Sequence, residues 1–211
     1  MILCSAVVSE DKLISTIQSL NEDDSVGGII LQLPLSSHIN KKNVLDNISP
    51  DKDVDALSAA SWEKINNNED CIYPATATGI ITLLDKHDIE LKNKNVAVIG
   101  RSDLVGKPVA ILMEKRGANV TVCHTGTKDI PSITKKANIV VSATGVAGLI
   151  TKDYVSPGQV IVDVGINEGL VGDVAFDEVS EIVEYITPVP GGVGPMTVIS
   201  IFHNFAQLVG K

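Results

Sequence analysis

The segment from Val96 to Pro108 carries the clearest chemical signal in the sequence. It reads as a short apolar strand, a tight turn at Gly100-Arg101-Ser102, and a helix. Such a glycine turn lets main-chain N–H groups and the positive end of a helix approach a diphosphate, because no Cβ stands in the way. Ser102 stands at the second glycine of the usual G-x-G-x-x-G spacing, and Gly106 comes one residue late. The pattern predicts a dinucleotide site; a purely structural turn is the alternative.

Arg101 and the end of the next strand indicate which dinucleotide would bind. A site for NAD places an Asp or Glu after the second strand, where it accepts from the ribose hydroxyls. Here that strand ends in Cys123-His124-Thr125, without an acid. The guanidinium of Arg101 suits a 2′-phosphate, so NADP is the predicted cofactor. A solvated turn arginine is the alternative.

Two further segments carry polar side chains where an ordinary connection would not need them. Gln32 ends an apolar run that Pro34 stops, and Asp53 and Asp55 lie in the following loop. An amide at the end of a strand must be hydrogen-bonded if it is buried. Gln32 and Asp55 could recognise the polar edge of a ring; alternatively they are a strand-end amide and a turn carboxylate.

The segment from Pro188 to Thr197 contains three prolines and three glycines, and it leads into the last helix. This composition fixes a backbone shape that brings the main chain close to a flat ligand or to another backbone. A structural hinge is the alternative.

The histidines indicate no metal site. His38, His87, His124 and His203 have no Cys or acidic partner at ligand spacing, so we expect no metal. The chain also has no G-x-S-x-G segment, which argues against an α/β-hydrolase.

Apolar periodicity predicts the elements that position these residues. In the first part it predicts a helix after an N-cap at Ser9, a strand over 26–33, a helix over 41–48, a loop over 50–56, and a helix that includes 80–87 and is capped by Thr76 or Thr78. The second part predicts strands over 95–99, 119–123, 139–142, 160–164 and 184–187, alternating with helices over 105–116, 130–137, 176–182 and 196–209. This alternation predicts an α/β fold with a Rossmann-type, doubly wound parallel sheet over residues 78–195. Residues 1–77, together with 196–211, form a second α/β domain.

Composition and charge limit the class of protein. The chain has 211 residues, of which 44% are hydrophobic and 3% aromatic, so Ile, Val, Leu and Ala must fill the core, as is typical of buried parallel strands. A formal net charge of −9 argues against a nucleic-acid or anionic-membrane surface. No apolar run has the ~18 residues of a membrane span. Three cysteines without zinc spacing favour reduced thiols in the cytoplasm.

Seven motifs, taken in order, resemble the bifunctional methylenetetrahydrofolate dehydrogenase/methenyltetrahydrofolate cyclohydrolase family. They are Gln32-Leu-Pro34, Ser49-Pro-Asp-Lys-Asp-Val-Asp55, Gly100-Arg-Ser102 with Val105-Gly-Lys-Pro108, Val122-Cys-His124, Asp163-Val-Gly-Ile-Asn167, Gly172-Asp-Val174 and the segment from Thr187 to Thr197. The resemblance implies NADP-dependent oxidation of 5,10-methylenetetrahydrofolate and hydrolysis of the methenyl product to 10-formyltetrahydrofolate. It also implies two α/β domains, with residues 1–77 on the folate side, and a homodimer.

The resemblance also implies roles for individual residues. Gln32 supports the catalytic group and Asp55 holds the pterin edge. The cofactor side comprises Thr76, Gly100, Arg101, Ser102, Gly106, Thr125 and Ile166, and the folate side adds Pro34, Gly191, Gly192, Pro195 and Thr197. Thr125 replaces a usual Ser, and Ala56, Ala75 and Ala77 stand where Gly, Cys and Pro are usual.

The family's general base is not found in this sequence. Members of the family begin with roughly one more βαβ-sized segment, in which a Tyr-x-x-x-Lys motif supplies a ring-stacking phenol and the base. Here Tyr73, Tyr154 and Tyr185 are followed four residues later by Ala, Gly and Val. We therefore expect a first domain that is shortened at its N-terminus. Two hypotheses stay open: an enzyme of one-carbon metabolism, or a non-catalytic NADP-binding remnant or dimer partner that lacks the base.

Overall fold

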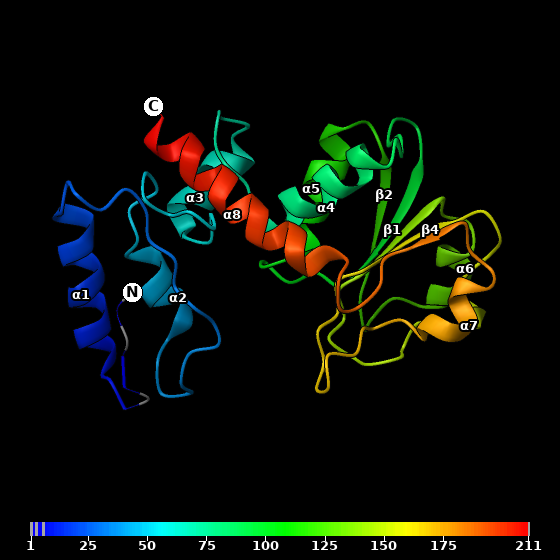
Figure 1. Cartoon of the computed structure of the whole chain (residues 1–211), viewed down its shortest axis with the longest axis horizontal. Helices are drawn as coiled ribbons and strands as arrows, with labels where there is room; N and C mark the ends of the chain where they lie inside the picture. The colour runs from blue at the N-terminus through cyan, green and yellow to red at the C-terminus, as the bar shows by residue number, and fades with distance from the viewer. Residues whose placement is uncertain (1, 3, 6, 211) are drawn as a thin grey trace. The chain divides into compact units, whose positions relative to one another are not determined.

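The computed structural model describes residues 2, 4, 5 and 7–210, and the chain divides into two compact units (Figure 1). The first unit comprises Met1–Ala75 and Ile201–Lys211, and the second comprises Thr76–Ser200. The boundaries fall within helices α4 (Ala75–Lys86) and α8 (Val193–Val209). They lie near the boundaries expected after residue 77 and before residue 196. No helix in the described part of the chain is both long and apolar enough to cross a membrane.

The second unit is built on a five-stranded sheet in the order β2-β1-β3-β4-β5, and every neighbouring pair is parallel. The strands are β1 (Asn95–Ile99), β2 (Asn119–Cys123), β3 (Ile139–Ser142), β4 (Val160–Asp163) and β5 (Tyr185–Ile186). Between them lie α5 (Gly106–Lys115), α6 (Ile130–Thr134), the 3-10 helix η1 (Lys152–Tyr154) and α7 (Phe176–Ser180). The predicted α/β fold with a parallel sheet is confirmed.

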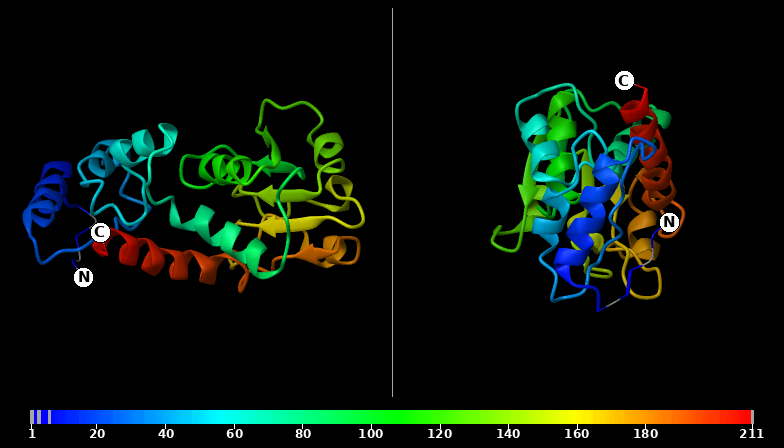
Figure 2. Two further views of the ribbon diagram at one scale, coloured as in Figure 1. Left: turned by 90° about the horizontal axis from the view of Figure 1, so that it is seen from above. Right: turned by 90° about the vertical axis from the view of Figure 1, so that its left-hand side faces the viewer.

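Side chains on the two faces of this sheet pack into separate cores. Val96 and Val98 of β1 contact one cluster, which includes residues of α4 and α5. Ala97 and Ile99 point the other way, into a cluster that includes residues of α6 and α7. Figure 1 shows these two pairs of helices on opposite sides of the strands, and Figure 2 gives two further views of the layers. Burial on both faces explains why the central strands β1, β3 and β4 are almost continuously apolar.

The strand order places a crevice beside β1. The chain moves from β1 to β2 on one side and from β2 back to β3 on the other, so the order reverses between β1 and β3. In open α/β sheets, ligands bind outside the carboxyl ends of the strands at such a point. Gly100 directly follows β1, and Ala143 directly follows β3.

The first unit is mainly helical in its described residues. Its helices are α1 (Glu10–Glu22), α2 (Lys41–Asp46), α3 (Ala59–Asn66) and the end of α8. The Ser9 side chain accepts from the N–H of Lys12 at 3.3 Å, which confirms the expected N-cap. Leu13 and Ile17 of α1 pack against Val44 of α2 in the core of this unit.

The strand expected over residues 26–33 does not form. Only Ile29 makes a parallel bridge, with Asp53: its N–H donates to the carbonyl of Lys52 at 2.6 Å, and its carbonyl accepts from Val54 at 3.3 Å. A strand needs consecutive pairs of this kind, and the described residues supply one. Within this apolar run Ile29 is buried in the core of the first unit, Val26 and Leu31 pack against that core, and Ile30 is 49% exposed.

Two helices begin earlier than expected. Helix α4 starts at Ala75, so Thr76 and Thr78 lie inside it, and the carboxylate of Asp55 accepts from the N–H of Ala75 at 3.0 Å. The cap therefore comes from a distant residue rather than from a neighbouring threonine. Helix α8 starts at Val193 instead of Met196. The N–H groups of the first turn have no partner within a helix, so Pro195, which lacks an N–H, is tolerated inside this turn.

Candidate functional site

The turn after β1 has the geometry of a phosphate-binding loop. Gly100 has φ 120°, and a Cβ at this residue would lie 2.3 Å from the carbonyl oxygen of Ala143. A Cβ on Gly106 would lie 2.3 Å from the carbonyl oxygen of Gly100. Neither position has room for a side chain, so helix α5 approaches β1 closely and its first turn faces the crevice. These residues fit a dinucleotide diphosphate.

Ser102 explains why the motif departs from the usual glycine pattern. Its hydroxyl oxygen accepts from the N–H of Val105 at 3.2 Å, and its carbonyl accepts from Lys107 at 3.0 Å. The serine side chain thus holds the turn that leads to Val105, the residue that precedes helix α5. A glycine at this position could not make the first of these contacts.

Arg101 and Thr125 lie just beyond the carboxyl ends of the neighbouring strands β1 and β2. Ile99 pairs with Cys123 at the ends of β1 and β2, so each of the two residues follows a paired strand end by two positions. Both are exposed. His124 is a turn residue, whose Nδ1 accepts from Gly126 at 3.0 Å. The segment from Cys123 to Thr127 contains no acid, which suits a 2′-phosphate better than a ribose diol.

A cleft of about 460 Å³ lies beside Leu104 and Val105, just before helix α5, within the second unit. It gathers six residues predicted to contact cofactor or folate: Thr76, Ile166, Gly191, Gly192, Pro195 and Thr197. The hydroxyl of Thr197 donates to that of Thr76 at 3.3 Å. A Cβ on Gly192 would lie 2.6 Å from the carbonyl oxygen of Pro188, so the proline-glycine segment folds tightly on itself.

The cleft also contains residues to which the sequence analysis assigned no role. Leu104, Asp163 and Leu170 lie on its wall. The Asp163-Val-Gly and Gly172-Asp-Val motifs were visible in the sequence, but a motif does not show which groups its carboxylates contact. Among the described residues, no cluster of three or more His, Cys, Asp or Glu could hold a metal ion.

Gln32, Pro34 and Asp55 lie in the first unit. Gln32 and Pro34 are exposed, and the Gln32 amide donates to the carbonyl of Leu33 at 2.9 Å. The segments that contain Ile29 and Asp53 run parallel where these two residues pair. The segment that continues to Gln32 and the one that continues to Asp55 therefore extend from this bridge in the same direction. The structure thus brings these two segments together at one end of the bridge.

Asp55 is the acid of this loop that suits a ligand. Burial raises the pKa of its carboxyl, the N–H of Ala75 lowers it, and the nearby charge of Asp53 raises it further. A half-buried carboxylate with a raised pKa gains from additional N–H donors, and a pterin edge offers such donors.

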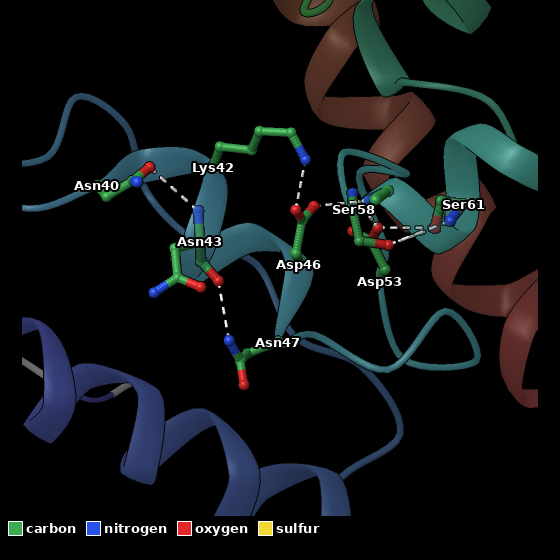
Figure 3. A network of polar contacts seen from close by, with 9 residues as sticks. Asn40, Lys42, Asn43, Asp46, Asn47, Asp53, Ser58 and Ser61 are labelled. Carbon is green, nitrogen blue, oxygen red and sulfur yellow. Dashed lines mark hydrogen bonds and ion pairs between the residues drawn. The ribbon is translucent and has the colours of Figure 1, made fainter.

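Asp53, two residues earlier, has a structural role (Figure 3). It is 2% exposed, and one of its oxygens accepts from the N–H of Ser58 at 2.8 Å and from the hydroxyl of Ser61 at 2.7 Å. Nearby, Asp46 bonds both Lys42 and the N–H of Ala59. These contacts hold the start of α3.

Lys52 is held by main-chain carbonyls. Its ammonium donates to Leu20 at 3.0 Å, and to Asn21 and Asp23 at 2.8 Å each. An ammonium has three protons, and all three are used at the end of α1. Lys52 is therefore a structural cation in this arrangement.

Asn204 is a further residue that the sequence analysis missed. It is buried on α8, and its amide donates to the carbonyls of Val54 at 3.0 Å and Tyr73 at 2.8 Å. It thereby fixes the chain on both sides of the contact between Asp55 and Ala75. The available signal was an amide in the largely apolar sequence of the last helix, which contains Asn204 and Gln207.

Comparison with known proteins identifies related sequences for both units. Residues 74–211 match the family described as Tetrahydrofolate dehydrogenase/cyclohydrolase, NAD(P)-binding domain, and residues 1–55 match the catalytic domain of the same description. The "Bifunctional protein FolD" of Brevibacillus brevis is 45% identical over 210 residues, which is 98% of this chain and 74% of that protein. The protein of the same name from Clostridium novyi is 46% identical over 203 residues, 95% of this chain and 73% of that protein.

Solved structures show the same similarity. The bifunctional FolD enzyme from Campylobacter jejuni has a TM-score of 0.93 and 40% identity, covering 97% of this chain and 74% of that one. The Trypanosoma brucei methylenetetrahydrofolate dehydrogenase-cyclohydrolase, solved with NADP and an inhibitor, has a TM-score of 0.91 and 36% identity, covering 97% and 74%.

Proposed function

Because this chain belongs to the tetrahydrofolate dehydrogenase/cyclohydrolase family, we propose that it serves both activities of that family. The first is NADP-dependent oxidation of 5,10-methylenetetrahydrofolate to 5,10-methenyltetrahydrofolate. The second is hydrolysis of that product to 10-formyltetrahydrofolate. The observation that carries the proposal is the glycine turn after β1, with no room for a Cβ at Gly100 or Gly106, next to the cleft of the second unit.

The second unit supplies the cofactor site in this proposal. The main chain of Gly100 to Ser102 and the start of α5 hold the diphosphate, while Arg101 and Thr125 bind the 2′-phosphate. Thr76 and Ile166 lie on the cleft side of the cofactor. NADP supplies the hydride acceptor when it is bound.

Folate-binding roles are assigned to residues in each unit separately. The Asp55 carboxylate accepts from the pterin edge, Gln32 supports the catalytic group, and Pro34 shapes the same segment. In the second unit, the main chain around Gly191 and Gly192, with Pro195 and Thr197, borders the folate. Each of these roles follows from the family resemblance. The cleft of the second unit supports the roles of Gly191, Gly192, Pro195 and Thr197, and the raised pKa supports that of Asp55.

We also propose a cytoplasmic enzyme that assembles as a homodimer. The three cysteines, all within the described residues, form no disulfide: Cys4 is exposed, Cys71 is half-buried and Cys123 is buried. Reduced thiols suit a reducing compartment. The homodimer follows from the family resemblance alone, and sedimentation of the purified protein tests it.

The function is tested with 5,10-methylenetetrahydrofolate and NADP, by following the appearance of NADPH, and separately with 5,10-methenyltetrahydrofolate, by following its loss. Asp55→Ala should abolish both signals but leave NADPH binding intact, because Asp55 lies in the folate site. Its control is Asp51→Ala, which removes an exposed carboxylate of the same loop. NADPH binding without either signal in the unmodified chain would favour the alternative, a non-catalytic NADP-binding module.

A further inference from the structure

A short hairpin at the cleft has exposed apolar side chains. We call residues 165–171 the flap. Its two sides pair at Asn167 and Val171, where the N–H of Asn167 donates to the carbonyl of Val171 at 2.9 Å. Ile166 and Leu170 on the flap are 70% and 61% exposed, and both line the cleft. Apolar side chains that face an open cleft indicate a surface that a ligand covers.

The base of the flap is tied to the end of β3 by Asp173, which is fully buried. One oxygen of its carboxylate accepts from the N–H of Thr144 at 2.6 Å, from that of Gly145 at 3.2 Å and from the Ser142 hydroxyl at 3.2 Å. The other oxygen accepts from the side-chain amide of Asn167 in the flap, at 3.1 Å. Asp173 therefore connects the flap with the crevice edge of the sheet.

Asp163, at the end of β4, completes the attachment. Its carboxylate accepts from the N–H groups of Gly165 and Asp173 at 2.9 Å each, and from that of Val174 at 3.0 Å. These three donors lie at the two ends of the flap, where the chain leaves β4 and where it returns. A Cβ on Gly172 would lie 1.9 Å from an oxygen of Asp163, so the carboxylate is closely enclosed.

Two acids suit this arrangement better than two amides. Every partner of both carboxylates is an N–H or O–H donor, and an ionised carboxylate offers acceptors only. An Asn at either position would turn an NH₂ group toward a donor. Burial of a carboxylate is costly, and it raises the pKa of Asp163 despite the three N–H donors. Two buried carboxylates that bind the base of one exposed hairpin indicate that the fold fixes the position of this hairpin.

We propose that Asp163 and Asp173 are positioning residues that hold the flap over the nicotinamide half of NADP, and that Leu170 contacts this half. The proposal rests on the proposed function. A dinucleotide crosses the sheet at the switch point, and its adenine half lies on the β2 side, where Arg101 and Thr125 are. The flap follows β4, on the other side of β1, so it faces the nicotinamide half.

The test compares two ligands on the full 211-residue chain. NADPH carries both halves, and adenosine 2′,5′-bisphosphate carries only the adenine half with its 2′-phosphate. Affinities are measured by calorimetry for the unmodified chain, Asp173→Asn, Asn167→Ala and Leu170→Ala. Asn167 is half-buried and Leu170 is exposed, so these two variants keep the fold even if Asp173→Asn does not.

All three variants should bind NADPH about tenfold more weakly, since they lose a charged hydrogen bond or an apolar contact. Their affinity for the bisphosphate should stay unchanged. Gln159→Leu is the matched control: Gln159 is buried at the opposite end of β4, and its amide donates to the carbonyls of Thr134 at 2.7 Å and Ala137 at 2.6 Å. This control should lower the unfolding temperature without changing the ratio of the two affinities.

Two results would overturn the inference: unchanged NADPH affinity in Asn167→Ala and Leu170→Ala, or an equal loss of both ligands in these folded variants. Failure of the cofactor site in the proposed function gives a different pattern. In that case the unmodified chain itself binds neither NADPH nor the bisphosphate.

Discussion

Arg101 is the residue on which the choice of cofactor depends. It follows β1 at the edge of the sheet where Thr125 follows β2, and no acid occupies the position that a ribose diol would need. A guanidinium can bind the extra phosphate of NADP with two parallel hydrogen bonds. Because Arg101 is exposed, its contribution should appear in binding rather than in stability.

Arg101→Ala should weaken NADPH binding by about 1.5–3 kcal/mol, which is roughly tenfold or more. NADH binding should stay nearly unchanged, because NADH lacks the 2′-phosphate. Fluorescence titration with both cofactors measures this. Arg116→Ala is the control, since Arg116 is also exposed but pairs with Asp85 at the far end of α5. Equal affinities of the unmodified chain for NADPH and NADH would remove the 2′-phosphate assignment.

Asp55→Asn should stabilise the folded protein at neutral pH. Burial raises the folded-state pKa of Asp55 above the ordinary value of 3.8. As the pH rises above 3.8, the unfolded chain loses this proton first, so stability falls until the raised pKa is passed. The Asn removes this loss and can still accept from Ala75. The unfolding temperature should therefore rise by a few degrees at pH 7, and the gain should shrink as the pH falls toward 3.8.

Asp53→Asn provides the opposite control. All contacts of Asp53 given above are with N–H and O–H donors, and the residue is buried, so this variant should lower the unfolding temperature. If Asp55→Asn also lowers it at pH 7, Asp55 is a structural acid and not one held ready for a ligand.

At the scale of elements, the sequence predicted the second unit better than the first. β1 and β3 were predicted to the residue, because strands buried on both faces are continuous apolar runs. Helix α3 was missed because its eight residues include only one large buried apolar side chain, Ile65. The prediction of a strand over 26–33 was wrong because an apolar run does not show how many of its residues pair with a neighbouring strand.

The site shows the same division. Gly100, Arg101 and Ser102 could be predicted because a local motif carries their geometry. The contacts of Asp163 and Asp173 could not, since they join residues as far apart in sequence as Ser142 and Asp173. A motif can show that a carboxylate is present, whereas the fold decides which N–H groups it meets.

The attachment of α1 through Lys52 gives a prediction at this scale. Lys52→Met removes three hydrogen bonds to carbonyls at the helix end and should lower the free energy of unfolding by roughly 1–3 kcal/mol. Denaturant unfolding measures the change. Lys64→Met is the control, because Lys64 makes only an exposed ion pair with Asp51 in the same unit. Lost hydrolysis with unchanged stability would instead identify Lys52 as a base.

At the scale of the whole molecule, the chain spans 74% of its Brevibacillus brevis relative and contains both family domains. The residues assigned to the cofactor lie in the second unit, and Gln32, Pro34 and Asp55 lie in the first. Oxidation needs the cofactor and a held folate, whereas hydrolysis also needs a base that activates water. The two activities therefore make different demands on the same chain.

A polypeptide of these 211 residues should bind NADPH, oxidise methylenetetrahydrofolate weakly and hydrolyse the methenyl product very slowly. The reason is that a general base contributes about 10²–10⁴-fold and no Tyr-x-x-x-Lys occurs in these residues. Joining the first segment of a relative, with its Tyr-x-x-x-Lys, should raise both rates, and the same segment with Lys→Met should restore neither fully. The rates are followed through NADPH formation and methenyl loss. Rapid hydrolysis by the 211-residue polypeptide alone would show that a group within it activates water, and since Lys52 is fully engaged with carbonyls, that group would have to be sought among the carboxylates, beginning with Asp55.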